Sequence, residues 1–145
     1  MTTPLATIGY EASTQDEVIG RLKAARVETV VDVRAVSSSR RAGFSKTVLA
    51  ASLAEAGIGY VHLRQLGTPK AGRDAARKGR VEEMRTIFEA HMTEPGAQLE
   101  LKAAEELAGS RKIALLCFEA DHNGCHRKIL AEQICQHLGC SIEHL

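Results

Sequence analysis

The sequence predicts an α/β fold: a single domain over residues 1–145, a Rossmann-like three-layer sandwich with a mostly parallel sheet of about five strands and helices on both faces. Short apolar runs alternate with segments whose apolar residues recur at helical spacing. The apolar runs are nearly unbroken, which is typical of parallel strands buried on both faces. The 145 residues suit one ordinary domain, and no linker, internal repeat or low-complexity tract interrupts them.

The first third of the chain contains two expected strands and two expected helices. Leu5–Tyr10 is the first apolar run, and Thr29–Val33, rich in β-branched residues, is the second. Between them, Thr14 and Glu17 have the spacing of a capping box, which predicts that a helix begins there. Apolar residues at helical spacing predict a second helix that Gly57 can end: Val48, Leu49, Leu53 and Ala56.

The middle of the chain is expected to hold a strand, a loop and a helix. Ile58–Leu63 has the pattern of a third strand. Gly67–Gly79 contains a proline and several cationic side chains, which predict an exposed loop with a solvated surface. A helix is expected next from four apolar residues: Val81, Met84, Ile87 and Phe88.

The last part of the chain is expected to contain two helices and two strands. Pro95 can open a helix that ends at Gly109. Lys112–Phe118 is the strongest strand pattern in the chain, and a final helix ending at Gly139 follows it. Ser141–Leu145 is long enough for a short last strand.

Composition excludes several classes of protein. Hydrophobic residues make up 44% and charged residues 26% of the chain, as in globular proteins, and a net charge of +1 argues against a general polyanion binder. Three Phe, two Tyr and no Trp leave little surface for stacking nucleic-acid bases. No segment has the roughly 18 apolar residues of a membrane span, and no signal peptide is evident. We therefore expect a cytoplasmic protein whose four cysteines are reduced thiols, with Cys135 and Cys140 as structural fillers.

The order of the elements predicts where a ligand binds. In open parallel sheets, ligands bind beyond the carboxyl ends of the strands. Polar residues follow four of the expected strands, and they should meet at one edge of the sheet: Tyr10-Glu11, Asp32 to Arg34, His62, and Cys117 to Arg127.

The loop after the fourth strand has the densest set of reactive residues. Cys125 lies where a helix begins, and a helix N-terminus together with neighbouring cations lowers the pKa of a thiol. We expect Cys125 or Cys117 to be a nucleophile, with Cys125 favoured, and Glu119 to be the acid–base partner. His126 and Arg127 are expected to bind substrate. The alternative is that Cys117 is a small buried hydrophobe and Cys125 only caps a helix.

Zinc binding and redox chemistry are less favoured interpretations of the same loop. Cys117, Cys125 and His126 with an acid could bind zinc, but their spacing is not a Cys-x-x-Cys pair, and an adjacent Cys and His seldom chelate one metal comfortably. The same spacing disfavours a Cys117–Cys125 redox pair. We expect no metal site, and no cofactor can be named.

A second group of candidate residues follows the first two strands. Asp32 and Arg34 point to the same side of a strand, and Arg40 follows in a serine-rich loop. One interpretation is an anion pocket of Arg34, Arg40 and Arg127, with Asp32 catalytic and Tyr10 binding substrate. The other is an ion pair of Asp32 with Arg34 or Arg40, and a Tyr10 hydroxyl bonded to a loop.

These motifs also resemble those of a known family. The residues that carry the resemblance occur in one order along the chain: Thr7-Ile-Gly-Tyr-Glu11, Val31-Asp-Val-Arg34, Ser39-Arg40, Phe44-Ser-Lys46, Gly57-Ile-Gly-Tyr60, Leu66-Gly67, Leu115-Leu-Cys-Phe-Glu119, Cys125-His-Arg127 and His144-Leu145. The chain resembles the domain-of-unknown-function family 488 from near Thr7 to Leu145. The resemblance implies an α/β fold with the motifs on one edge, and it supplies no activity.

The expected function is that of an enzyme acting on a small anionic substrate, phosphorylated or nucleotide-like. The alternative is a non-catalytic domain that senses a nucleotide or binds a protein or nucleic acid. Binding of nucleic acid through the cationic Lys70–Arg80 segment is possible but not favoured, because the net charge is near neutral. The oligomeric state is not predicted.

Overall fold

The computed structural model describes residues 3–145 and contains one five-stranded sheet in the order β3-β2-β4-β1-β5. All neighbouring strands are parallel, which confirms the predicted α/β class. The strands are β1 (Leu5–Gly9), β2 (Thr29–Asp32), β3 (Gly59–His62), β4 (Ile113–Cys117) and β5 (Ile142–His144). In the register of the sheet, Gly9 pairs with Cys117 and Asp32 with Leu116, so β1, β2 and β4 end side by side.

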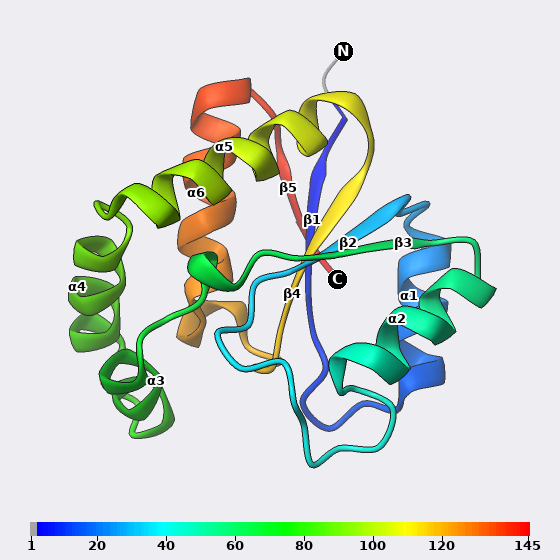
Figure 1. Cartoon of the computed structure of the whole chain (residues 1–145), viewed down its shortest axis with the longest axis horizontal. Helices are drawn as coiled ribbons and strands as arrows, with labels where there is room; N and C mark the ends of the chain where they lie inside the picture. The colour runs from blue at the N-terminus through cyan, green and yellow to red at the C-terminus, as the bar shows by residue number, and fades with distance from the viewer. Residues whose placement is uncertain (1–2) are drawn as a thin grey trace.

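Six α-helices cover the two faces of the sheet (Figure 1). The helices are α1 (Gln15–Ala24), α2 (Lys46–Glu55), α3 (Lys70–Arg77), α4 (Val81–His91), α5 (Pro95–Ser110) and α6 (His126–Leu138), with short 3₁₀ helices η1 (Arg64–Leu66) and η2 (His122–Gly124). Helices α1 and α2 lie on one side of the strands, and α3 to α6 lie on the other (Figure 1). No helix within residues 3–145 combines the length and apolar character that crossing a membrane requires.

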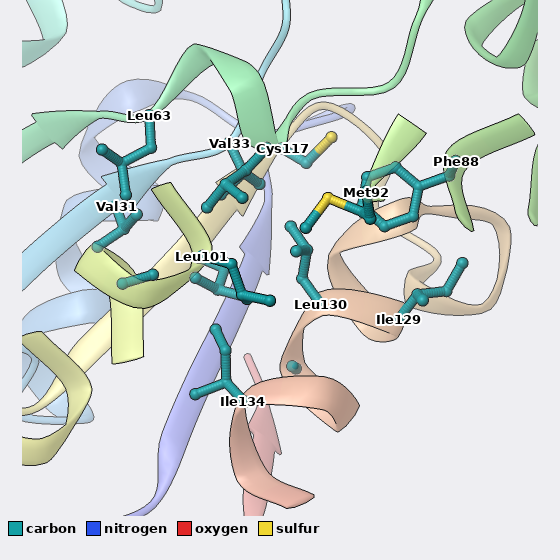
Figure 2. Close-up of a cluster of buried hydrophobic side chains, with 14 of the residues drawn as sticks. Val31, Val33, Leu63, Phe88, Met92, Leu101, Cys117, Ile129, Leu130 and Ile134 are labelled. Atoms are coloured by element: carbon teal, nitrogen blue, oxygen red, sulfur yellow. The ribbon is translucent and has the colours of Figure 1, made fainter. Parts of the chain in front are cut away.

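The sheet divides the apolar core into two clusters, as a strand buried on both faces requires. Along β4, Ala114 and Leu116 belong to the cluster under α1 and α2, whereas Leu115 and Cys117 belong to the cluster under α4, α5 and α6. Figure 2 shows the second cluster, with Phe88 of α4 at its edge. Cys117 therefore points to the side of the sheet on which α6 begins.

Local signals set the helix ends where they were expected. The Thr14 side chain accepts a hydrogen bond from the Glu17 backbone and the Glu17 side chain accepts one from the Thr14 backbone, which confirms the capping box of α1. Gly57 and Gly139, after α2 and α6, have positive φ angles of 78° and 73°, a conformation that favours glycine. Helix α5 runs one residue past Gly109, its expected end.

The predicted loop at Gly67–Gly79 is wrong, because most of it forms α3. Packing explains the difference: α3 contacts α4, and Gly72 is buried where a β-carbon would lie 2.3 Å from Thr68 Cγ2. A glycine that weakens an isolated helix is here the residue that permits close packing. The Lys70–Asp74 ion pair, at 3.1 Å and one helical turn apart, adds local support.

The expectation that Cys135 and Cys140 are reduced fillers is also wrong, because they form a disulfide. The left-handed residue Gly139 ends α6 and turns the chain back, and the Cα atoms of the two cysteines come to 4.6 Å. Cys117 and Cys125 are the free cysteines, and both are buried.

Candidate functional site

A cavity of about 260 Å³ lies at the carboxyl ends of β1, β2 and β4. The segments that follow these strands line one side of it, the start of α6 lines the floor, and α3 and the first turn of α4 face them. The lining residues with chemical groups are Tyr10, Arg34, Thr68, Arg73, Arg77, Met84, Cys117, Phe118, Glu119, Cys125 and His126. The cavity is therefore where the loop after β4 was expected to bind a ligand.

Two thiols and one imidazole meet at the floor of this cavity. Cys117 is the last residue of β4, Cys125 is the N-cap of α6, and His126 is the first residue of that helix. The Nδ1 atom of His126 lies 3.7 Å from Cys117 Sγ and 3.8 Å from Cys125 Sγ. These three atoms all lie within 4.8 Å of one another, and all three residues are buried. We call Cys117, Cys125 and His126 the thiol–imidazole cluster.

The backbone fixes the tautomer of His126. Its Nε2 atom lies 2.8 Å from the carbonyl oxygen of Val33, and because a carbonyl only accepts, Nε2 must carry a proton and donate it. In the neutral ring, Nδ1 then has a free lone pair that faces the two sulfurs. This arrangement of a thiol, a base and a third group that orients the base is the geometry of nucleophilic cysteine sites.

The surroundings favour charge separation between Cys125 and His126. Burial disfavours a thiolate, but a hydrogen bond with Cys117 and the positive charges of His126 and Arg127 outweigh it, so the pKa of Cys125 falls well below that of an ordinary cysteine. Burial lowers the pKa of an imidazole, but the Cys125 sulfur, the Val33 carbonyl and Glu119 outweigh burial and raise the pKa of His126. Cys125 is therefore the better nucleophile of the two free cysteines.

Cys117 and Glu119 are shifted in the opposite sense. The hydrogen bond between Cys117 and Cys125, with burial and the negative charges nearby, raises the pKa of Cys117 well above that of an ordinary thiol. Burial and the charge of Cys125 raise the pKa of Glu119, whose Oε2 atom lies 3.3 Å from Cys117 Sγ. Both groups therefore hold protons more tightly than usual beside the Cys125 sulfur.

Asp32 and Arg34 form a buried ion pair. Arg34 Nη2 lies 2.7 Å from Asp32 Oδ2, and Arg34 Nε lies 2.9 Å from Asp32 Oδ1. Arg34 Nη1 also donates to the Phe44 carbonyl at 2.7 Å and to the Tyr10 hydroxyl at 3.1 Å. Arg34 and Tyr10 line the cavity, but the charge of Arg34 is neutralised by Asp32, which is not among the residues that line it. The geometry matches the ion-pair interpretation of this strand end.

Tyr60, which the sequence predicted only as part of a family motif and not as a site residue, completes this ion pair. The Tyr60 hydroxyl donates a hydrogen bond to Asp32 Oδ2, and burial together with that bond raises the pKa of Tyr60. The signal was available in principle, because Tyr60 is in β3 and pairs in register with Val30, two residues before Asp32.

Arg127 and Arg40 lie outside the cavity lining. Arg127 is 1% exposed, and its guanidinium donates to the carbonyl oxygens of Glu119 and Ala120, so it braces the loop that carries Glu119. Arg40 is exposed in the segment between β2 and α2. Of the three arginines expected to hold an anion, Arg34 is the one that the cavity contains.

Two other arginines face the cavity instead. Arg73 and Arg77 are one turn apart on α3 and line the same cavity as the thiol–imidazole cluster. Arg73 donates to the Thr68 carbonyl at 2.9 Å, and Arg77 pairs with Asp74 at the exposed side of the helix. The segment was predicted to be a solvated surface. The i, i+4 spacing of the two arginines was the signal that could have placed both on one side of a helix.

One family model matches the chain, over residues 14–134, and it is described as domain of unknown function DUF488. The match spans α1 to most of α6 and includes all three residues of the thiol–imidazole cluster. No curated protein and no solved structure matches the chain.

Proposed function

We infer that this chain, which belongs to the DUF488 family, is an enzyme that acts on a small anionic substrate with Cys125 as the nucleophile and His126 as its base. One observation carries the proposal: both residues line a cavity, and His126 turns its Nδ1 lone pair to the sulfurs while Val33 holds its other nitrogen. A nucleophile beside an oriented base is the shared requirement of covalent thiol catalysis.

The residues around Cys125 have roles that suit such a reaction. The Cys125 sulfur would attack an electrophilic carbon or phosphorus atom of the substrate, a bond to sulfur would form, and the bond to the leaving group would break. Glu119, which lines the same cavity, would give its proton to the leaving group. It would then take a proton from a water molecule that attacks the same substrate atom, so that the bond to the Cys125 sulfur breaks and the free thiolate returns. Cys117 would be a positioning residue, because its thiol donates a hydrogen bond to Glu119 Oε2 and lies 3.7 Å from His126 Nδ1.

The cations of α3 support an anionic substrate, phosphorylated or nucleotide-like. Arg73 and Arg77 line the same cavity as the thiol–imidazole cluster, and a phosphate or carboxylate accepts well from guanidinium groups. Asp32 and Arg127, expected as catalytic and substrate-binding residues, are assigned here to positioning, because Asp32 pairs with Arg34 and both terminal nitrogen atoms of Arg127 donate to backbone carbonyls.

Cys125 is expected to react with iodoacetamide at neutral pH roughly tenfold faster than Cys117, since a thiolate and not a thiol is the nucleophile. Peptide mass spectrometry of the partly alkylated protein measures both rates in one sample. The two rates can be compared directly because both cysteines line the same cavity. Cys117→Ser should keep the fast reaction and Cys125→Ser should lose it. Preferential labelling of Cys117 would contradict the choice of nucleophile.

Turnover separates the enzyme from the non-catalytic alternative. Phosphate esters, acyl phosphates and nucleotides are the substrates to screen, and Cys125→Ser should lower kcat on any that turns over by roughly 10³-fold. An activity that survives in Cys125→Ser would overturn the choice of nucleophile. A ligand that binds through the arginines and is not turned over, in a protein whose Cys125 is inert, would favour a binding domain.

Charge selectivity tests the role of α3. In the wild type, Cys125 should react with the anion iodoacetate almost as fast as with neutral iodoacetamide. Replacing Arg73 and Arg77 with alanine should slow the iodoacetate reaction roughly tenfold and leave the iodoacetamide reaction within about twofold, because a cationic cavity concentrates anions. The matched control is Lys70→Ala with Arg80→Ala, which removes two cations of the same segment that are not among the cavity-lining residues. An equal iodoacetate rate in both double variants would remove the basis for an anionic substrate.

A further inference from the structure

We propose that the thiol–imidazole cluster binds one thiophilic divalent cation, for which Zn²⁺ is the probe, and that the bound cation masks Cys125. The binding site depends on the positions of Cys117 Sγ, Cys125 Sγ and His126 Nδ1 alone. The masking rests on the proposed function, in which Cys125 is the nucleophile.

The separations between His126 Nδ1 and the two sulfurs fit a common centre. Zinc binds sulfur at about 2.3 Å and histidine nitrogen at about 2.0–2.1 Å, so in a tetrahedral site the sulfur and nitrogen ligands are about 3.6 Å apart. The observed separations are 3.7 Å and 3.8 Å. Nδ1 has one lone pair and can accept from one thiol only, yet both sulfurs lie almost equally far from it. A cation between the three atoms would use that lone pair and both sulfurs at once.

The outer side of the imidazole is arranged as metal-binding histidines require. Such a histidine usually donates its second ring nitrogen to a carboxylate or backbone carbonyl, which fixes the ring and its tautomer. His126 Nε2 donates to Val33 at 2.8 Å in this way, and the His126 side chain is buried.

Charge and access also suit a divalent cation. Two thiolates would neutralise its charge, which a buried site requires because an unpaired buried charge is costly. Arg127 opposes the cation, but its guanidinium donates to two backbone carbonyls of the adjacent loop. The cluster also lines the cavity, so a fourth ligand can come from there, either a water molecule or Glu119, which lies 3.3 Å from Cys117. Three protein ligands with an accessible fourth position are typical of catalytic zinc sites.

Tertiary structure removes the objection that the spacing raised. Cys117 and Cys125 are not a Cys-x-x-Cys pair, but the η2 turn brings the start of α6 back to the end of β4. Cys125 has extended backbone angles of −129° and 143°, whereas His126 is the first helical residue. This change of conformation between neighbours lets two adjacent side chains converge on one point.

Cobalt substitution tests the binding site. The full chain, freed of metal with a chelator under reducing conditions, is titrated with Co²⁺, whose thiolate charge-transfer and tetrahedral d–d absorption bands report sulfur ligands. We expect the bands to saturate at one equivalent and Zn²⁺ to abolish them. Cys117→Ser, Cys125→Ser and His126→Gln should each weaken Co²⁺ binding by more than about 100-fold. The Cys135→Ser, Cys140→Ser double variant is the matched control and should bind as the wild type does.

Alkylation tests the masking. One equivalent of Zn²⁺ should slow the reaction of Cys125 with iodoacetamide by at least tenfold, and a chelator should restore it. Absence of the bands at one equivalent, or their persistence in the Cys117→Ser and Cys125→Ser variants with native circular dichroism, would overturn the site. Binding without protection of a reactive Cys125 would overturn the masking. A metal-free protein with an inert Cys125 that still binds Co²⁺ would overturn the proposed nucleophile and leave the site intact.

Discussion

Asp32→Ala is expected to lower the free energy of unfolding by roughly 3–5 kcal/mol. Asp32 is 0% exposed and Arg34 is 5% exposed, so the substitution leaves a guanidinium buried without its counter-charge. It also removes the acceptor of the Tyr60 hydroxyl. Urea denaturation followed by circular dichroism measures the loss.

Two further variants show whether the cause is the buried charge. Asp32→Asn keeps the shape of the side chain and an acceptor oxygen but removes the charge. Its free energy of unfolding should therefore lie between those of the wild type and Asp32→Ala. Asp74→Ala breaks the surface pairs with Lys70 and Arg77 and should cost less than about 1 kcal/mol. If Asp32→Ala lowers the free energy of unfolding by less than about 1 kcal/mol, the ion pair does not stabilise the end of β2.

The same variants test the catalytic role that the sequence suggested for Asp32. As a positioning residue outside the cavity lining, it should affect the alkylation of Cys125 only through stability. Folded Asp32→Asn protein at low temperature should therefore label at close to the wild-type rate. A rate that falls tenfold without loss of structure would return Asp32 to the catalytic machinery.

Gly9→Ala is expected to displace the loop that carries Glu119 and, with it, Arg127, whose positive charge helps to lower the pKa of Cys125. Alkylation of Cys125 should then slow by at least roughly tenfold. A β-carbon on Gly9 would lie 1.7 Å from the carbonyl oxygen of Glu119 and 3.0 Å from Arg127 Nη1. The first clash is with backbone, so no side-chain rotation relieves it. Overpacking of this kind typically lowers the free energy of unfolding by about 1–3 kcal/mol. Here it also breaks the hydrogen bond from Arg127 to the Glu119 carbonyl.

The measurements for Gly9→Ala are the urea midpoint and the iodoacetamide rate at Cys125. Gly20→Ala, inside α1, is the matched control, because its β-carbon would meet no atom within 4 Å. Alanine is the better helix former, so this control should be neutral or more stable by up to about 1 kcal/mol. Wild-type labelling in a folded Gly9→Ala protein would show that the position of Arg127 does not matter to the thiol.

The strands and most helices could be predicted because their signals are local. The unbroken apolar run of β4 and the capping box at Thr14 need no knowledge of the rest of the chain. The prediction for the segment of α3 was wrong for the opposite reason. Its cations and glycines predict a loop, whereas its helix depends on packing against α4. The Cys135–Cys140 disulfide likewise depends on the turn at Gly139 and not on composition.

The sequence by itself determined the fold class and the place of the candidate site. A parallel sheet brings the ends of its strands to one edge, so the residues after β1, β2 and β4 had to lie near one another whatever the strand order. Only the tertiary structure decided which of them act on each other. It neutralises Arg34 with Asp32, turns Arg127 to backbone carbonyls, and places Arg73 and Arg77 across the cavity. It also brings Cys117, nine residues before His126, to the same nitrogen that faces Cys125. Such choices depend on ångström-scale distances between side chains from separate elements, and the spacing of residues along a chain does not contain them.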